Sequence, residues 1–329
     1  MEKLLQVEKL ETEFTRDKQK TKILHGVNFH INKGEVLGLV GESGSGKSIT
    51  SLSIMKLFKG TSGAISGGRL RFNDEDLTNK SEGEMRKIRG KQIAMIFQEP
   101  MTSLNPVMKI GEQLLEPIRL HLGLIEKKAR EHAISILKKV GIPRAEEIMN
   151  EFPHQLSGGM RQRIMIAMAI SCNPQLLIAD EPTTALDVTI QAQILDLMKQ
   201  LQQTEKMSVL LITHDLGVVA EMCDRVVVMY AGKVVEEADV FDLYESPKHP
   251  YTRGLIASVP KLGQKREKLD SIKGNVPDPN NLPTGCKFAP RCNEVLPICL
   301  NEEPPEIKLE NGRLCSCWLH KEEGVGIHV

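Results

Sequence analysis

The chain has 329 residues, which is long enough for two domains with separate cores or for one large domain with an appendage. Its 43 acidic and 43 basic residues balance, so the composition gives no sign of the basic face that binds nucleic acid, and we expect no nucleic-acid partner. The charged N-terminus lacks a signal-peptide core and no stretch approaches about 18 consecutive apolar residues, so we expect a cytoplasmic chain without membrane spans.

Loose alternation of apolar and polar residues predicts two N-terminal strands, 4–14 and 23–31, paired as an antiparallel edge. Phe14 lies in the first strand, where its ring could stack on a nucleotide base or fill a half-buried position. The sequence leaves both interpretations open.

Residues 41–48, GESGSGKS, fit the phosphate-binding pattern G-x-x-x-x-G-K-[ST]. The run 35–40 predicts a buried strand before them, and 47–57 predicts a helix after them, which is the context that phosphate binding requires. Lys47 is placed to reach the outer phosphates and Ser48 to ligate Mg²⁺. A plain Gly/Ser turn is the alternative, which the flanking elements disfavour. The residues expected to hold the nucleotide are Gly41, Ser43, Gly44, Ser45, Gly46, Lys47 and Ser48.

The next elements are predicted as a connector, a short strand, a polar helix and a buried strand: 59–68, 69–72, 82–89 and 93–97. Gln98 ends the buried strand, and EPMTSLNP after it predicts a loop. From 109 to about 149, apolar residues recur at helical spacing and predict an inserted helical segment.

The octet LSGGMRQR places Ser157 at the start of a helix that runs to about residue 171. Gly158 and Gly159 leave bare N–H groups there, which makes a second candidate anion-binding helix terminus. An ordinary Ser-Gly-Gly turn is the alternative for the octet by itself.

Two further apolar strands, 176–179 and 208–213, end in polar side chains: Asp180 and Glu181 after the first, His214 after the second. Carboxylates at the end of a buried strand are costly unless they hold a cation or a proton in transit. We assign Asp180 to Mg²⁺, Glu181 to activation of the attacking water as general base, and His214 to the γ-phosphate. A solvated acidic loop and a structural histidine are the alternatives.

Strands alternate with helices here, including a helix predicted over 189–203, which indicates a mainly parallel sheet. Ligands of such sheets bind at the carboxyl ends of the strands. The polar residues at predicted strand ends are Gln98, Asp180, Glu181 and His214.

Together these elements resemble an ATP-binding cassette (ABC) ATPase over residues 4–245. The matching motifs, in order, are Walker A GESGSGKS, the Q-loop Gln98, the signature LSGGMRQR, Walker B LLIADEP with its glutamate, the D-loop ALD and the switch His214. Six elements in one order are highly specific, because adenylate kinases, small GTPases and helicases share the first loop but lack the signature.

The resemblance implies that two cassettes pair head to tail, so that the signature of one closes on the γ-phosphate held by the other. The residues to which it assigns this contact are Ser157, Gly158 and Gly159, with Asp187 of the D-loop also at the nucleotide. It implies catalytic roles for Gln98 and His214 beside Glu181. The Mg²⁺ ligands that it implies are Ser48, Gln98 and Asp180.

The residues after the cassette narrow the resemblance. KHPYTRGLIASVP (248–260), IKGNVPDPNNLPTGCKFAPRC (272–292) and the earlier FQEPMTSLNP look like parts of dipeptide and oligopeptide importer ATPases. That subfamily implies attachment to the cytoplasmic face of the membrane through two separate permease subunits, which dock on the helical insertion, and an extracellular peptide-binding protein. The second ATPase of the pair is either a second copy or a related chain.

Five of the seven cysteines fall between residues 286 and 317, in a proline-rich segment with little core of its own, which suggests a metal staple. Spacing alone names no metal, because zinc knuckles and ferredoxin spacings are both absent. The resembled subfamily carries a [4Fe–4S] cysteine motif, which implies as ligands Cys286, Cys292, Cys299 and Cys317, with Cys315 as the alternative fourth. Iron–sulfur is our first interpretation, zinc the second and reduced thiols the third. Cys172 and Cys223 are expected to be buried structural thiols.

The sequence thus predicts an α/β fold: a P-loop (RecA-like) core with an antiparallel β edge and an inserted helical subdomain, followed by an irregular Cys-rich extension. We expect a nucleotide-binding domain over 1–245, its helical subdomain over about 99–170, and a C-terminal region over 246–329. The predicted function is ATP hydrolysis with Mg²⁺ that drives dipeptide or oligopeptide uptake. Import of nickel or another small solute is one alternative, and a DNA-repair or regulatory ATPase with a redox-sensing cluster is another.

Overall fold

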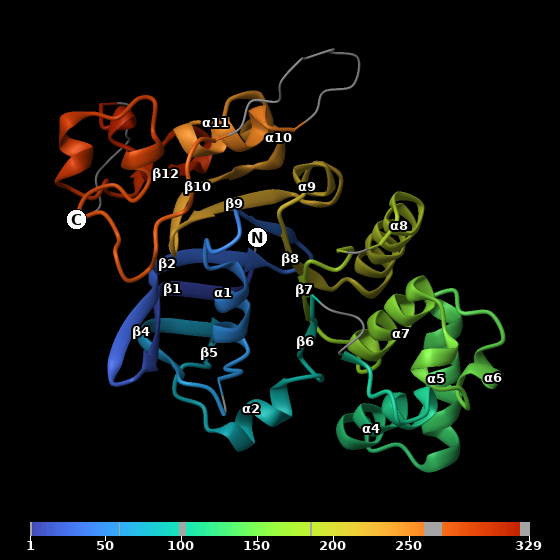
Figure 1. Cartoon of the computed structure of the whole chain (residues 1–329). Helices are drawn as coiled ribbons and strands as arrows, with labels where there is room; N and C mark the ends of the chain where they lie inside the picture. Colours follow the sequence, from blue (N-terminus) through green and yellow to red (C-terminus); the bar gives the residue numbers. More distant parts are fainter. Residues whose placement is uncertain (1, 59, 99–102, 185, 260–271, 323–329) are drawn as a thin grey trace. The chain divides into compact units, whose positions relative to one another are not determined.

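The structure is a computed structural model that describes residues 2–58, 60–98, 103–184, 186–259 and 272–322 (Figure 1). The predicted loop residues 99–102, Ala185 of the D-loop motif and Pro260 lie outside the described residues. Contacts divide the chain into two compact units that interleave along the sequence. The first unit comprises Met1–Glu2, Asn32–Glu35 and Asn79–Leu211, and the second comprises Lys3–Ile31, Val36–Thr78 and Ile212–Val329.

The second unit contains a four-stranded sheet in the order β2-β1-β4-β5 (Figure 1). Its strands are β1 (Lys3–Arg16), β2 (Gln19–Asn32), β4 (Gly63–Phe72) and β5 (Glu75–Asp76). Leu5, Leu10, Leu24, Ile31 and Leu70 are fully buried on it, in the apolar positions of the alternating pattern. The two predicted N-terminal strands are therefore present, each slightly longer than expected.

The prediction of a connector over 59–68 is wrong in its second half, because β4 begins at Gly63. β4 pairs antiparallel with β1, with Phe14 opposite Gly63 and Glu11 opposite Gly67. A Cβ at position 63 would lie 2.8 Å from the Phe14 ring, so glycine permits this close pairing. The glycines that were predicted to lie in a loop are therefore strand residues, and their lack of a side chain lets the partner strand approach closely.

The second unit also holds five strands in the order β11-β12-β10-β9-β3. They are β3 (Val36–Val40), β9 (Arg225–Tyr230), β10 (Lys233–Asp239), β11 (Ile307–Lys308) and β12 (Leu314–Cys315). β3 runs parallel to β9 and is buried at all five positions, as the apolar run predicts. Gly38 lets Cys223 approach β3, since a Cβ there would lie 2.9 Å from the Cys223 sulfur.

The part of this unit that the structure describes also contains four helices and four short 3₁₀ turns. They are α1 (Lys47–Ile54), α9 (Leu216–Met222), α10 (Val240–Glu245), α11 (Pro250–Ala257), η2 (Ala289–Arg291), η3 (Pro297–Leu300), η4 (Glu310–Gly312) and η5 (Trp318–His320). α1 ends three residues before the predicted helix end at residue 57.

The first unit contains β6 (Ile93–Ile96) and β7 (Leu176–Asp180), which pair in parallel, and β8 (Ser208–Thr213) next to β7. The unit boundary falls within β8, after Leu211. The helices and the turn of this unit are α2 (Glu82–Ile88), α4 (Ile110–Leu122), α5 (Glu126–Lys139), α6 (Ala145–Ile148), η1 (Pro153–Gln155), α7 (Gly158–Ile170) and α8 (Val188–Glu205).

Local capping explains where several helices begin. Ser81 and Glu84 form a reciprocal capping box at α2, and the Ser157 hydroxyl accepts a hydrogen bond from the Met160 N–H at α7. α4, α5 and α7 pack on one another through the apolar residues that the helical spacing predicted. No helix within the described residues is long and apolar enough to span a bilayer.

The C-terminal segment is fixed to β10 by a buried ion pair. The Glu236 side chain, 1% exposed, accepts hydrogen bonds from the Arg313 guanidinium at 3.1 Å and from the Lys248 and His249 N–H groups at 2.8 Å each. Arg313 also donates to the Ser246 carbonyl at 2.7 Å. A buried carboxylate with several donors is stable only while those donors remain.

We expect Arg313→Ala to lower the free energy of unfolding by about 3–5 kcal/mol, because it leaves a buried carboxylate without its cation. Urea unfolding followed by the fluorescence of Trp318, the one tryptophan of the chain, measures this. The control is Lys20→Ala, which breaks a pair with Glu13 whose lysine is 66% exposed and should cost at most about 1 kcal/mol. Equal effects of the two variants would show that the buried pair does not anchor the segment.

Candidate nucleotide-binding site

The phosphate-binding loop of the second unit adopts a backbone shape that requires glycine. Gly41, Gly44 and Gly46 have φ of 151°, 80° and 103°, and a Cβ at Gly41 would lie 2.2 Å from the Met229 carbonyl oxygen. α1 begins directly after Gly46, with neither a capping side chain nor an acidic residue in its first turn. Its first N–H groups therefore present the partial positive charge of a helix N-terminus to a ligand.

The side chains of this loop fit a phosphate group. The Lys47 ammonium donates to the Gly41 and Glu42 carbonyl oxygens at 2.6 and 3.0 Å and lies within the loop. The buried Ser45 hydroxyl has no hydrogen-bond partner among the described residues. Ser43, Gly44 and Ser48 are exposed. A buried polar group without a partner beside an open backbone cradle is the arrangement that an anion would complete.

The strand ends of the first unit bring two predicted catalytic residues together. Gln98 donates to a Glu181 carboxylate oxygen at 2.9 Å, and the Thr184 hydroxyl donates to the same oxygen at 2.9 Å. Asp180 is the last residue of β7 and is 5% exposed. Glu181 has a φ of 48°, which a residue with a side chain rarely adopts. The chain therefore stores backbone strain at the residue predicted to be the general base.

The signature segment lies at the start of α7 as predicted. Ser157 and Gly158 are exposed, and no atom lies within 4 Å of a Cβ placed on Gly158. Gly159 faces α8 more closely, with a Cβ position 3.1 Å from Ile190. The buried Gln162 of α7 donates from its side-chain amide to the Pro182 carbonyl, which fixes the loop after Glu181.

Three other predicted residues have the following contacts. The Asp187 carboxylate caps α8 by accepting from the Ile190 N–H at 3.0 Å. His214 follows the last residue of β8 and is exposed. The half-buried Phe14 packs edge to face on Phe58, with ring centroids 5.9 Å apart, which is the packing role that the sequence left open.

Thr184 and Gln162 were not singled out from the sequence. Both belong to motif segments, TTALD and LSGGMRQR, but only the structure shows that their side chains bind Glu181 and the Pro182 carbonyl.

Comparisons with known proteins agree with these motifs. The family described as ABC transporter matches residues 24–184, and the family described as oligopeptide/dipeptide transporter, C-terminal region, matches residues 235–299. The oligopeptide transport ATP-binding protein AppD of Bacillus subtilis is 56% identical over 98% of this chain and 99% of its own length. The chain belongs to the ABC transporter ATPases.

Further relatives and solved structures extend this result. The dipeptide transport ATP-binding protein DppD of Bacillus subtilis is 49% identical over 98% of this chain and 96% of its own length. The solved structure of the ATP-binding cassette MJ0796 as a post-hydrolysis dimer with ADP and phosphate covers 72% of this chain and 99% of that chain, at 28% identity and a TM-score of 0.64. The predicted P-loop α/β fold is therefore confirmed for the cassette.

In this ABC ATPase the clustered cysteines form no disulfide bonds. Burial raises the pKa of Cys286 and Cys292, and it raises the pKa of Cys317 to about 11, with further contributions from the other thiols. Cys317 interacts electrostatically with Cys286, Cys292 and Cys299, whereas Cys315 is influenced mainly by burial and Glu236. The four thiols named as ligands therefore lie near enough to influence one another, and Cys315 packs with Cys317 in a small apolar cluster.

The placement of these thiols does not itself fit a metal ion. Within the described part of the chain, no three Cys, His, Asp or Glu side chains form a group that could hold one. We therefore derive no catalytic step through a cluster. Cys172 and Cys223 are buried, as predicted, and burial raises the pKa of both, so they are inert thiols.

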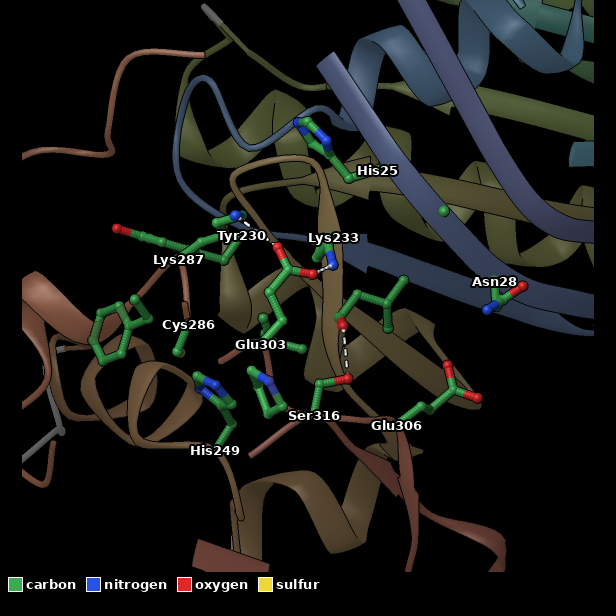
Figure 2. A pocket seen from close by; sticks show the side chains of 15 residues that line it. His25, Asn28, Tyr230, Lys233, His249, Cys286, Lys287, Glu303, Glu306 and Ser316 are labelled. Carbon is green, nitrogen blue, oxygen red and sulfur yellow. Dashed lines mark hydrogen bonds and ion pairs between the residues drawn. The ribbon is translucent and has the colours of Figure 1, made fainter. Parts of the chain in front are cut away.

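A pocket of about 670 Å³ lies beside the cysteine segment (Figure 2). Glu303 sits at its centre, where its carboxylate pairs with Lys233 of β10 and with Lys287 at 2.6 Å. Burial raises the pKa of Glu303, but the bonds and charges of the two lysines outweigh that effect and lower it. These charges satisfy one another and fasten the segment to β10, and none of the predicted nucleotide-binding residues lines the pocket.

We expect Gly41→Ala to weaken ATP binding about 10- to 100-fold, because the new Cβ would meet a carbonyl oxygen of β9 and force the loop out of its shape, at a strain of about 1–3 kcal/mol. Calorimetric titration of the full chain with Mg-ATP measures the dissociation constant. Gly83→Ala in α2 is the control, since no atom lies within 4 Å of its Cβ position. Unchanged affinity in Gly41→Ala would show that the loop shape does not govern binding.

Proposed function

We propose that the chain is the ATP-hydrolysing subunit of an importer of dipeptides or oligopeptides. The observation that carries this is similarity over nearly the whole chain, including the region after the cassette, to proteins named for oligopeptide and dipeptide transport. Nickel uptake and DNA repair are less well supported, because neither term occurs among the names of these relatives. Peptide uptake by vesicles that contain this ATPase with its permease subunits is the direct test.

The phosphate loop would bind the triphosphate of ATP. The N-terminus of α1, which no side chain caps, and the Lys47 ammonium within the loop would bind the phosphate oxygens. Mg²⁺, held by Ser48, Asp180 and the side-chain oxygen of Gln98, would neutralise charge on the β- and γ-phosphates. The Gln98 amide nitrogen already binds Glu181, which leaves its oxygen as the ligating atom.

Glu181 is the proposed general base. Gln98 and Thr184 donate to the same carboxylate oxygen, so they hold the side chain in one orientation, from which it would accept the proton of an attacking water. His214 is the proposed contact to the γ-phosphate, as part of the same strand-end set. Loss of orientation at Glu181 should therefore slow hydrolysis more than it weakens ATP binding.

A second cassette would complete the site. The proposed contacts from it are Ser157, Gly158 and Gly159, which are half-buried or exposed at the start of α7, with Asp187 beside them. Bare N–H groups at a helix start suit a phosphate. The MJ0796 cassette is a dimer in its post-hydrolysis structure, which supports such pairing. The partner is either a second copy or a related ATPase.

The helical segment of the first unit would bind the permease. Val107, Leu120 and Ile125, at and near the ends of α4 and α5, are 80%, 73% and 68% exposed. Apolar side chains this exposed suit an interface with another protein. We propose that a permease helix docks here, that the transporter contains two permease subunits which hold the ATPase at the cytoplasmic face of the membrane, and that an extracellular peptide-binding protein supplies the substrate. The proposed domains remain 1–245, with helices over about 99–170, and 246–329.

The cysteine segment is a proposed [4Fe–4S] site, a proposal that rests on the sequence resemblance. The common neighbourhood of Cys286, Cys292, Cys299 and Cys317 supports it. Within the described residues their side chains do not form a metal-binding group, and cluster binding requires the thiols to lose protons and draw together.

We expect Glu181→Gln to lower ATP turnover about 10²- to 10⁴-fold, because an amide cannot accept the proton of the attacking water. ATP binding should persist, so an ATP-dependent dimer should accumulate; phosphate release and size-exclusion chromatography measure the two effects. Glu205→Gln, which alters the glutamate paired with Lys139 at the end of α8, is the control and should retain turnover. Near-normal turnover in Glu181→Gln would remove the general-base assignment.

We expect Cys317→Ser to abolish the iron, sulfide and visible absorption of anaerobically purified protein, because it removes one of four ligands. Cys315→Ala should retain all three signals, because Cys315 is not among the four proposed ligands. Metal analysis and an absorption spectrum measure both. Colourless wild-type protein, whether zinc-loaded or metal-free, contradicts the iron–sulfur proposal.

A further inference from the structure

Glu42, the second residue of the phosphate loop, is held by residues that lie more than 200 positions away in the sequence. Its carboxylate pairs with both terminal nitrogens of Arg291, at 2.6 and 2.9 Å. Its N–H donates to the Tyr251 hydroxyl at 2.8 Å. Its carbonyl accepts from the Lys47 ammonium at 3.0 Å and from the Ser45 N–H at 3.1 Å. The side chain, the N–H and the carbonyl of one loop residue are thus all bound.

Arg291 is itself held in a single orientation. Its guanidinium also donates to the Lys273 carbonyl at 2.9 Å, the Ile272 carbonyl at 3.3 Å and the Tyr230 hydroxyl at 3.3 Å, and it lies 5.7 Å from the centre of the Tyr230 ring. Its side chain is 5% exposed. A buried, two-pronged arginine–carboxylate pair fixes geometry as well as charge.

Tyr251 is equally constrained. It is fully buried in α11, and its ring centre lies 4.7 Å from that of Tyr230 and 5.4 Å from that of Phe288. Rings packed in this way leave the hydroxyl little freedom, so it can hold the Glu42 N–H at a defined position.

The ion pair between Glu42 and Arg291 affects the electrostatics of the nucleotide site as well as the packing around it. A carboxylate in a loop that receives a triphosphate raises the energy of the bound anion. The Arg291 guanidinium compensates the charge of that carboxylate and binds both of its oxygens. A residue that only attached the C-terminal region would not need to contact an acid of the phosphate loop.

We propose that Arg291 and Tyr251 are positioning residues of the nucleotide site, which hold Glu42 so that the phosphate loop is shaped for ATP before ATP arrives. This rests on the proposed ATPase function and adds that residues of the C-terminal region complete the nucleotide loop. Arg291 lies between Cys286 and Cys292 in the sequence. Its ion pair with Glu42 therefore couples the conformation of the cysteine segment to that of the phosphate loop.

The expected signature is weaker binding with little change in turnover. When the loop adopts its ATP-binding conformation in only a fraction of the molecules, the apparent dissociation constant rises by the inverse of that fraction. Once ATP is bound, the loop is in this conformation in every complex, so turnover changes little. We expect Arg291→Gln to raise the dissociation constant and KM for Mg-ATP about 10-fold, and Tyr251→Phe about 3-fold, with kcat within about 2-fold of wild type. Arg291→Lys should recover part of the loss, because it keeps the charge without the second prong.

The test is a double-mutant cycle in the full-length chain with Glu42→Gln, Arg291→Gln and both, measured by Mg-ATP calorimetry, steady-state hydrolysis and thermal unfolding. The double variant should bind no more weakly than Arg291→Gln, because the two residues act as one unit. Arg253→Gln, which breaks a 3.0 Å pair with Glu294 in the same segment, is the control and should leave KM unchanged.

Additive effects, or a lower melting temperature with unchanged KM, would overturn the proposal, because a merely structural pair behaves in that way. Tyr251→Phe removes one oxygen and keeps the buried ring. If Arg291→Gln does not fold, the KM of Tyr251→Phe for Mg-ATP tests the proposal instead. A wild-type chain that binds Mg-ATP but does not hydrolyse it contradicts the proposed function and leaves the binding comparison intact.

Discussion

A backbone loop that receives a triphosphate must hold a strained shape, and the second unit is arranged around that requirement. Gly41, Gly44 and Gly46 have positive φ angles, and α1 begins directly after them without a capping side chain. Such a loop has few hydrogen bonds of its own to keep its shape. Its shape must therefore come from contacts around it, which are the buried strand β3 before it, the Lys47 ammonium within it and the Arg291 and Tyr251 contacts to Glu42.

The first unit meets a different requirement, which is to hold one carboxylate in a fixed direction. Glu181 has a left-handed backbone conformation that costs about 1–3 kcal/mol. Bonds from Gln98 and Thr184 hold its side chain, and Gln162 holds the peptide that follows it. Other residues of this unit, such as Arg144 and Asn173, also have positive φ, so what distinguishes Glu181 is the set of three side chains that hold it and the peptide after it.

The sequence predicted the structural features that depend on residues close together in the chain. Strand and helix periodicity, the glycine-rich loop and the polar residues at strand ends all depend on neighbours within a few positions, and the predicted order of elements through β8 is present. Gly63 and Gly67 were assigned to a connector because glycine usually ends a strand, whereas here it allows Phe14 and Glu11 to approach. The pairing of Glu42 with Arg291 spans 249 positions, and no periodicity or spacing rule connects residues so far apart.

The C-terminal region also depends on contacts between residues that are distant in the sequence. It has little regular structure and yet is firmly attached. Three ion-pair groups bind it to the rest of the second unit: Arg313 to Glu236, Arg291 to Glu42, and Glu303 between Lys233 and Lys287. A segment with a small apolar core cannot be stable by burial alone, so ion pairs that are buried or partly buried contribute to its attachment. One of these pairs, Arg291 with Glu42, includes a residue of the phosphate loop. For this reason we expect that loss of order in the cysteine segment would first lower the affinity for ATP.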